Sequence, residues 1–144
     1  VVAETWPGRP WRSVSDLHTA LLGSLAAASE EQQLALIRAH PDLVGRAALA
    51  GTLSRESTAE QRAAGLDPGA LTPQEIAAFQ HLNARYQDRF GFPFVICARE
   101  YQKDAILAEL GRRAQSARAE EISTAVREIG RIAWWRLQDV VVDK

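Results

Sequence analysis

The fold is decided by residues 72–91, TPQEIAAFQHLNARYQDRFG. Thr72 is a favourable N-cap residue, and Pro73 and Glu75 follow it at helical positions where proline and a capping glutamate are favoured. Apolar side chains then recur at helical spacing, in a stripe made of Ile76, Phe79, Leu82, Tyr86 and Phe90. Gly91 is a natural end for this helix. The stretch therefore predicts a long amphipathic helix with one face in a core.

The rest of the chain shows the same helical pattern with short connections. A cap at Ser13 or Ser15, a capping box of Ser29 with Gln32, and helical apolar spacing mark further helices around residues 13–25, 29–40, 57–65, 106–110 and 122–140. Residues 43–53 are Ala-rich and predict a short helix or turn. Only residues 92–99, FPFVICAR, look extended, and they have no obvious strand partner. We predict a single all-α domain over residues 1–144, a multi-helix bundle of about seven to eight helices with one short extended apolar segment.

Composition excludes several classes of function. The chain has 17 basic and 18 acidic side chains and a formal charge of −1, so no broad field favours nucleic acid or an anionic membrane. Its apolar runs are far shorter than the roughly 20 residues of a membrane-spanning helix. One cysteine, Cys97, cannot form an internal disulfide, which favours a cytoplasmic protein. The chain begins at Val1 and contains no methionine, so we expect residues to be missing in front of it.

A few side chains are candidates for chemistry. His40 lies at a helix end beside Pro41, where histidine can act in catalysis or simply interact with the helix dipole. Glu60 follows Ser57 at capping-box spacing, so a structural cap and a functional carboxylate compete for this residue. Arg99 closes the apolar run and suits either a surface ion pair or a carboxylate anchor. Cys97 has apolar neighbours and is interpreted as a packing residue. No spacing of histidines and cysteine suggests a metal site.

Three segments, taken together, resemble one known family. They are residues 40–45, HPDLVG, residues 57–66, STAEQRAAGL, and residues 90–99, FGFPFVICAR. In this order and spacing they are similar to the decarboxylases that act on 2-oxo-4-hydroxy-4-carboxy-5-ureidoimidazoline (OHCU) in urate degradation. The resemblance extends over nearly the whole chain, from about Val2 to about Val140. The family usually has a further N-terminal stretch, and an initial helix is therefore expected to be absent here.

The resemblance implies a helical enzyme that needs no cofactor and no metal, is commonly a homodimer, and converts OHCU to (S)-allantoin. It implies catalytic roles for His40 and Glu60. It also implies substrate contacts for a larger set of residues, which are Pro41, Ser57, Gln61, Phe92, Phe94, Val95, Ile96, Ala98 and Arg99. A physical association with the preceding hydroxyisourate hydrolase is compatible with the resemblance, but the sequence does not address it.

Two other functions stay open at this point. A helical binding module could have kept the fold without the activity, although the joint presence of His40, Glu60 and Arg99 argues against it. A cofactor-free lyase or hydrolase could act on a related ureide, and the sequence distinguishes this only weakly from OHCU decarboxylation.

Overall fold

The computed structural model describes residues 14–45, 51, 53–66 and 68–142. Within them lie six α-helices, which are α2 (Val14–Ala27), α3 (Glu30–Arg38), α5 (Arg55–Ala63), α6 (Pro73–Phe90), α7 (Lys103–Arg113) and α8 (Arg118–Val142). Two 3₁₀ turns, η2 (Pro68–Ala70) and η3 (Ala98–Glu100), complete the regular structure of this part of the chain, which contains no β-strand. The predicted all-α class is therefore confirmed.

The described residues contain six α-helices, against the seven to eight expected for the whole chain. The segment around residues 43–53, predicted as a short helix or turn, runs as a non-helical loop at 43–45 and then lies mostly outside the described residues. Ser13, one of the two caps proposed for the first helix, also lies outside them, and Ser15 is already inside α2.

Helix ends follow the local sequence signals at α3 and α6. Ser29 and Gln32 form a complete capping box at α3, and Thr72 and Glu75 form another at α6, so each helix begins with two backbone N–H groups satisfied. Gly91 ends α6 in a left-handed conformation with φ of 78°, which costs glycine little. These predictions of helix boundaries are confirmed.

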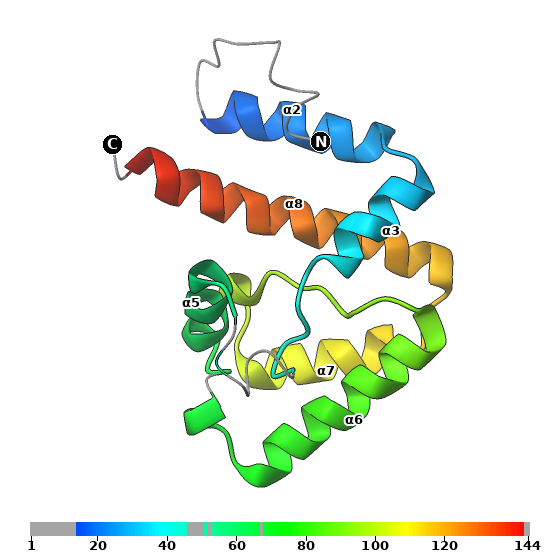
Figure 1. The fold of residues 1–144 in the computed structure, drawn as a ribbon, viewed down its shortest axis with the longest axis vertical. Coiled ribbons are helices and arrows are strands. Elements are labelled where there is room, and N and C mark those ends of the chain that lie inside the picture. The colour runs from blue at the N-terminus through cyan, green and yellow to red at the C-terminus, as the bar shows by residue number, and fades with distance from the viewer. Residues whose placement is uncertain (1–13, 46–50, 52, 67, 143–144) are drawn as a thin grey trace.

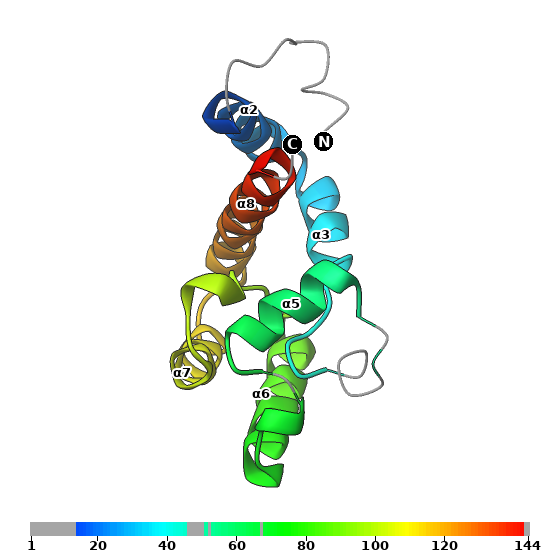
Figure 2. The ribbon, with the colours of Figure 1, turned by 90° about the vertical axis from the view of Figure 1, so that its left-hand side faces the viewer.

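The long helix α8 is the spine of the fold. It runs beside α2 and also packs on α3, whereas α6 and α7 pack on each other at the other end of the molecule (Figures 1 and 2). Gly130 lets α2 approach closely, because a Cβ atom there would lie 2.5 Å from Leu22 Cδ2. His18 Nε2 lies 2.8 Å from the Gly130 carbonyl oxygen and joins the same two helices.

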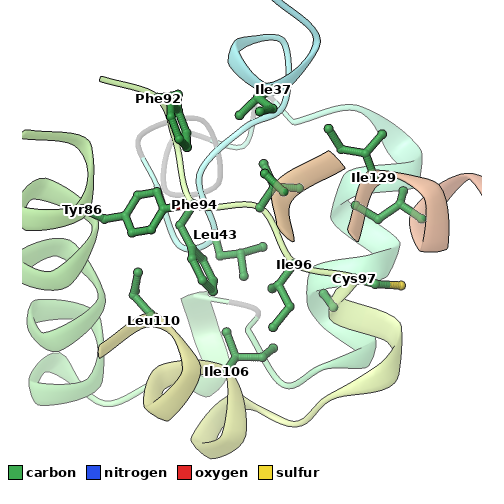
Figure 3. Close-up of a cluster of buried hydrophobic side chains, with 14 of the residues drawn as sticks. Ile37, Leu43, Tyr86, Phe92, Phe94, Ile96, Cys97, Ile106, Leu110 and Ile129 are labelled. Atoms are coloured by element: carbon green, nitrogen blue, oxygen red, sulfur yellow. The ribbon is translucent and has the colours of Figure 1, made fainter. Parts of the chain in front are cut away.

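The extended segment predicted at residues 92–99 is present at residues 92–97, runs through the middle of the molecule and ends at η3, which takes up Ala98 and Arg99 (Figure 1). Its side chains are buried: Phe92, Phe94 and Cys97 are each at most 1% exposed and pack among residues of several helices (Figure 3). A buried segment with no strand partner needs other groups to satisfy its peptides. Side chains supply them here, since Arg113 donates to the Val95 carbonyl at 2.9 Å and Glu128 accepts the Cys97 N–H at 3.1 Å.

A buried polar network fixes Arg113 in its turn. Its Nε donates to Glu121 at 2.8 Å, and Tyr86 donates its hydroxyl to the same carboxylate oxygen at 2.6 Å. The guanidinium also lies 4.5 Å from the ring centre of Phe94. Both members of the ion pair are almost completely buried, so removing either one would leave an uncompensated charge in the core. This network holds the extended segment in a single position.

Candidate active site

A cavity lies where the His40 loop, α5, the extended segment and α8 meet. Its empty space is about 380 Å³. Its walls mix apolar and polar groups, as small-molecule sites generally do. The residues that line it are His40, Pro41, Leu43, Ser57, Glu60, Gln61, Phe94, Val95, Ile96, Ala98, Ile132 and Arg136.

Most of the residues predicted for the site meet in this cavity. The two predicted catalytic residues line it, as do Pro41, Ser57, Gln61, Phe94, Val95, Ile96 and Ala98. The structure does not bring Phe92 or Arg99 to its walls. Phe92 packs in the core against Tyr86 and Phe90. Arg99 forms an ion pair with Asp139 at 2.6 Å, the first of the two roles that its sequence position suggested.

His40 is placed by the end of α3. The helix ends at Arg38 with Ala39 as its C-cap, and the His40 ring lies beside it with Nδ1 2.9 Å from the Leu36 carbonyl oxygen. A carbonyl oxygen can only accept, so Nδ1 carries a proton and Nε2 of the neutral ring is left with a free lone pair. Burial lowers the pKa of His40 below its usual 6.5, and the positive charge of Arg136 lowers it further. His40 is therefore set up as a neutral base at pH 7.

The loop after His40 is held by two buried amides. Gln61 accepts the Val44 N–H at 3.1 Å and donates to the Asp42 carbonyl at 3.5 Å, and Asn83 donates to the Leu43 carbonyl at 2.8 Å. Val44 has a left-handed φ of 51°, which is costly for a β-branched residue and persists only where its surroundings enforce it. Gln61, predicted as a substrate contact, thus uses both ends of its amide to shape the loop that carries His40.

Glu60 does not cap its helix. The prediction of a Ser57–Glu60 capping box is wrong, because α5 begins three residues earlier, with Ser54 as its N-cap accepting the Ser57 N–H at 3.1 Å. Glu60 lies in the second turn of α5. Its carboxylate receives two hydrogen bonds from Arg136, at 2.8 and 2.9 Å. The competition between a cap and a functional carboxylate is therefore resolved against the cap.

Arg136 is the residue of this site that sequence reasoning missed. It stands on α8, one helical turn after Ile132, which also lines the cavity. Its side chain is 38% exposed, whereas the side chain of its partner Glu60 is 12% exposed. The pair joins α5 to α8 at the wall of the cavity, which both side chains line. An arginine on an amphipathic helix is usually interpreted as a surface residue. The hint in the sequence is the spacing of Arg136 from Ile132, which places both side chains on one face of the helix.

Other groups near the site are ordinary in their chemistry. Cys97 is buried, and burial together with the charges of Glu100 and Glu128 raises the pKa of its thiol to about 12. It therefore stays protonated at neutral pH, in agreement with the predicted packing role. Within the part of the chain that the structure describes, no group of three or more His, Cys, Asp and Glu side chains is placed to hold a metal ion. No helix there is long and apolar enough to cross a bilayer.

Fold and site together define a class: a small all-helical protein whose pocket offers a neutral imidazole, a carboxylate and a guanidinium to one small ligand. Comparison with known proteins gives the family. The family model described as OHCU decarboxylase matches residues 1–138. The chain belongs to this family.

Similar proteins cover most of the chain. The OHCU decarboxylase of Amia calva is 41% identical over 144 residues, which is 98% of this chain and 79% of the relative. The OHCU decarboxylase of Xenopus laevis is 35% identical over all of this chain and 81% of its own. A crystal structure of (S)-allantoin synthase is 30% identical, with a TM-score of 0.68 over 95% of this chain and 40% of that one. A crystal structure of OHCU decarboxylase in the presence of (S)-allantoin has the same fold, with a TM-score of 0.76 at 19% identity over 96% of this chain and 89% of that one.

Proposed function

We propose that this protein decarboxylates OHCU to (S)-allantoin in urate degradation. The observation that carries the proposal is the meeting of three side chains in one cavity: His40 from the loop after α3, Glu60 from α5 and Arg136 from α8. Membership of the OHCU decarboxylase family and the similarity to proteins named for OHCU and allantoin support the choice of substrate.

The substrate contributes much of the chemistry. Its carboxylate is attached to a carbon that also carries a hydroxyl group and adjoins a ring C=N bond. The electron pair released when CO₂ leaves can enter that bond, so the substrate contains its own electron sink. The protein has to orient the carboxylate and accept the hydroxyl proton as the carbon that lost CO₂ becomes a carbonyl carbon. It also has to deliver a proton to one face of the neighbouring carbon, which belonged to the C=N bond.

The three side chains have properties that match these tasks. Arg136 is the guanidinium in the cavity wall, and guanidinium groups bind carboxylates through paired hydrogen bonds. We assign to it the carboxylate that leaves as CO₂. His40 has a free Nε2 lone pair and a lowered pKa, which suits proton transfer near neutral pH. When the substrate carboxylate takes the place of Glu60 at Arg136, the Glu60 side chain is left to hold the substrate hydroxyl.

Peptide groups of the extended segment supply further recognition. Ile96 lines the cavity, and neither its N–H nor its C=O makes a hydrogen bond within the described residues. Buried peptide groups are nearly always paired, so those of Ile96 are suited to the ureido and ring carbonyl groups of the substrate. A ligand without these groups would leave the Ile96 peptide unpaired, which is a strong basis for discrimination.

The finer features of the enzyme are part of the proposal. We expect residues 1–144 to act as one OHCU decarboxylase domain, without cofactor or metal, as a homodimer in the cytoplasm. The substrate's own electron sink supports the absence of a cofactor, and a single buried cysteine is compatible with a reducing compartment. Association with the preceding hydroxyisourate hydrolase would shorten the path of an unstable substrate.

The test is to add the protein to freshly generated OHCU and follow the circular dichroism of the product with time. We expect decay faster than the spontaneous reaction and an excess of (S)-allantoin. Spontaneous decay to racemic product, in spite of ligand binding, would instead indicate a binding module. Loss of the OHCU signal without CO₂ release would indicate a hydrolase of related ureides.

A further inference from the structure

A second, outer chamber opens beside the catalytic cavity. It shares four lining residues with that cavity, His40, Pro41, Ser57 and Arg136, and it adds Arg38 and Ser54 among others. Its empty space of about 930 Å³ is larger than that of the inner cavity, and it is the more open of the two. The shared wall makes the outer chamber the approach to His40.

The charges around the outer chamber are unequal. Arg136 is compensated by Glu60 at 2.8 Å. Arg38 is held by a hydrogen bond from Nε to the Gly91 carbonyl at 3.2 Å, and no carboxylate of the described residues forms an ion pair with it. The positive end of α5, capped by Ser54, faces the same space. Glu56 lies in the first turn of α5, but it lines neither chamber. Among the described residues, the lining of the outer chamber therefore has an excess of positive charge.

We propose that the outer chamber is an anion-binding antechamber, in which Arg38 first receives the carboxylate of the incoming ureide before Arg136 takes it in the inner cavity. The chemical class of ligand is a small organic carboxylate. This inference rests on the proposed function, because it needs a substrate that carries a carboxylate. The chamber would favour the substrate over the product. Decarboxylation removes the anionic group, so the neutral product has no charge for Arg38 to hold as it leaves.

The size of the effect follows from the exposure of Arg38. Charged clefts can raise association rates by about 10- to 1,000-fold, but a single exposed charge is strongly screened by salt. Arg38 is exposed and contributes a single charge, so we expect an effect at or below the lower limit of that range, a loss of about three- to tenfold in kcat/KM when its charge is removed. The effect should fall on KM rather than on kcat, because Arg38 lines the outer chamber and not the inner cavity.

The experiment compares Arg38→Gln, Arg38→Lys and the matched control Arg85→Gln in the full chain. Arg85 is an exposed residue of α6 that lines neither chamber, so its substitution changes the net charge equally. OHCU turnover is measured at about 20 mM and about 500 mM salt, where the screening length differs several-fold. We expect Arg38→Gln to lose kcat/KM at low salt and to approach wild type at high salt, with Arg38→Lys largely preserved. Arg85→Gln should match wild type throughout.

Two results would overturn the antechamber. One is an Arg38→Gln variant that behaves like Arg85→Gln at both salt concentrations. The other is a loss of kcat/KM that is equal in Arg38→Lys and Arg38→Gln and is not relieved by salt. It would mean that Arg38 acts only through its hydrogen bond to the Gly91 carbonyl. Failure of the proposed function looks different, because wild-type protein itself would then leave OHCU decay unchanged. Thermal denaturation of each variant separates these outcomes from misfolding.

Discussion

Substituting Glu60 by glutamine tests the site most directly. The change removes one charge and keeps the size and shape of the side chain. Ser54 caps α5, so the substitution leaves the start of the helix intact. What it alters is the pair of hydrogen bonds from Arg136, because each bond goes to a different carboxylate oxygen and glutamine replaces one of these oxygens by an NH₂ donor.

The expected loss of stability is small. The two side chains are 12% and 38% exposed, which places the pair between a surface ion pair, worth about 0–1 kcal/mol, and a buried one, whose disruption costs about 3–5 kcal/mol. With one hydrogen bond retained, we expect Glu60→Gln to lose about 1–2 kcal/mol. In a domain of this size each kcal/mol corresponds to a few degrees of melting temperature.

The expected loss of activity is larger. If Glu60 holds the substrate hydroxyl and takes part in proton transfer, its replacement should slow turnover by about 10²-fold or more, equivalent to about 2.7 kcal/mol or more of activation free energy. The assay is the initial rate of OHCU decay, measured by circular dichroism on protein shown to be folded at the assay temperature. Glu56→Gln provides the control, because it makes the same change on the same helix outside the cavity.

A folded Glu60→Gln variant with wild-type turnover would refute this reasoning. It would reduce the Glu60–Arg136 pair to a link between α5 and α8. A loss shared equally by Glu56→Gln would point to the overall charge of α5 instead of the cavity carboxylate.

Other predictions concern the remaining groups. His40→Asn should fold and lose about 10²-fold or more of the acceleration over spontaneous decay, as single-turnover rates would show. Because burial lowers the pKa of His40, the acid limb of the pH profile of kcat/KM should lie below pH 6.5. The contribution of His40 to the free energy of unfolding should be complete above pH 6.5 and should decline as the pH falls through the folded-state pKa, which denaturant titrations at several pH values would reveal. Cys97→Ala should keep most turnover and lose modest stability. Thiol reagents should act slowly on the wild-type protein, because its thiol is buried and has a pKa of about 12. Prolonged chelation should leave OHCU decay unchanged; activity lost and then restored by zinc would contradict the metal-free mechanism.

The helices could be predicted because their signals are local. Thr72 and Glu75 form a capping box only three residues apart, and Gly91 stops α6 through its own backbone freedom. The same reasoning failed at Ser57 and Glu60, where the capping pattern is present but the helix has already begun. Ser54, three residues earlier, occupies the cap, and a pattern this short cannot show which of two serines the folded chain will use.

The site was predictable only in part, for a related reason. His40 could be found because Pro41 follows it and marks a helix end. Arg136 is paired with Glu60 across 76 positions of the sequence, and no local pattern reports such a contact. The burial of Arg113 was equally hidden, since an arginine beside another arginine at the end of a helix looks like a surface residue.

Two of the arginine–glutamate pairs of this fold, Arg113–Glu121 and Arg136–Glu60, have different tasks, and their surroundings show why. Arg113 and Glu121 are 1% and 2% exposed, line neither chamber, and bind Tyr86 and the Val95 carbonyl as well as each other. Such a pair has no room to change partners, so it fixes the wall of the cavity. Arg136 and Glu60 stand in that cavity and are partly open to solvent. In the proposed mechanism, the substrate carboxylate displaces Glu60 from Arg136 at little cost, because solvent and substrate can satisfy both groups during the exchange. The Arg113–Glu121 pair therefore keeps the cavity wall in place while the Arg136–Glu60 pair can exchange partners.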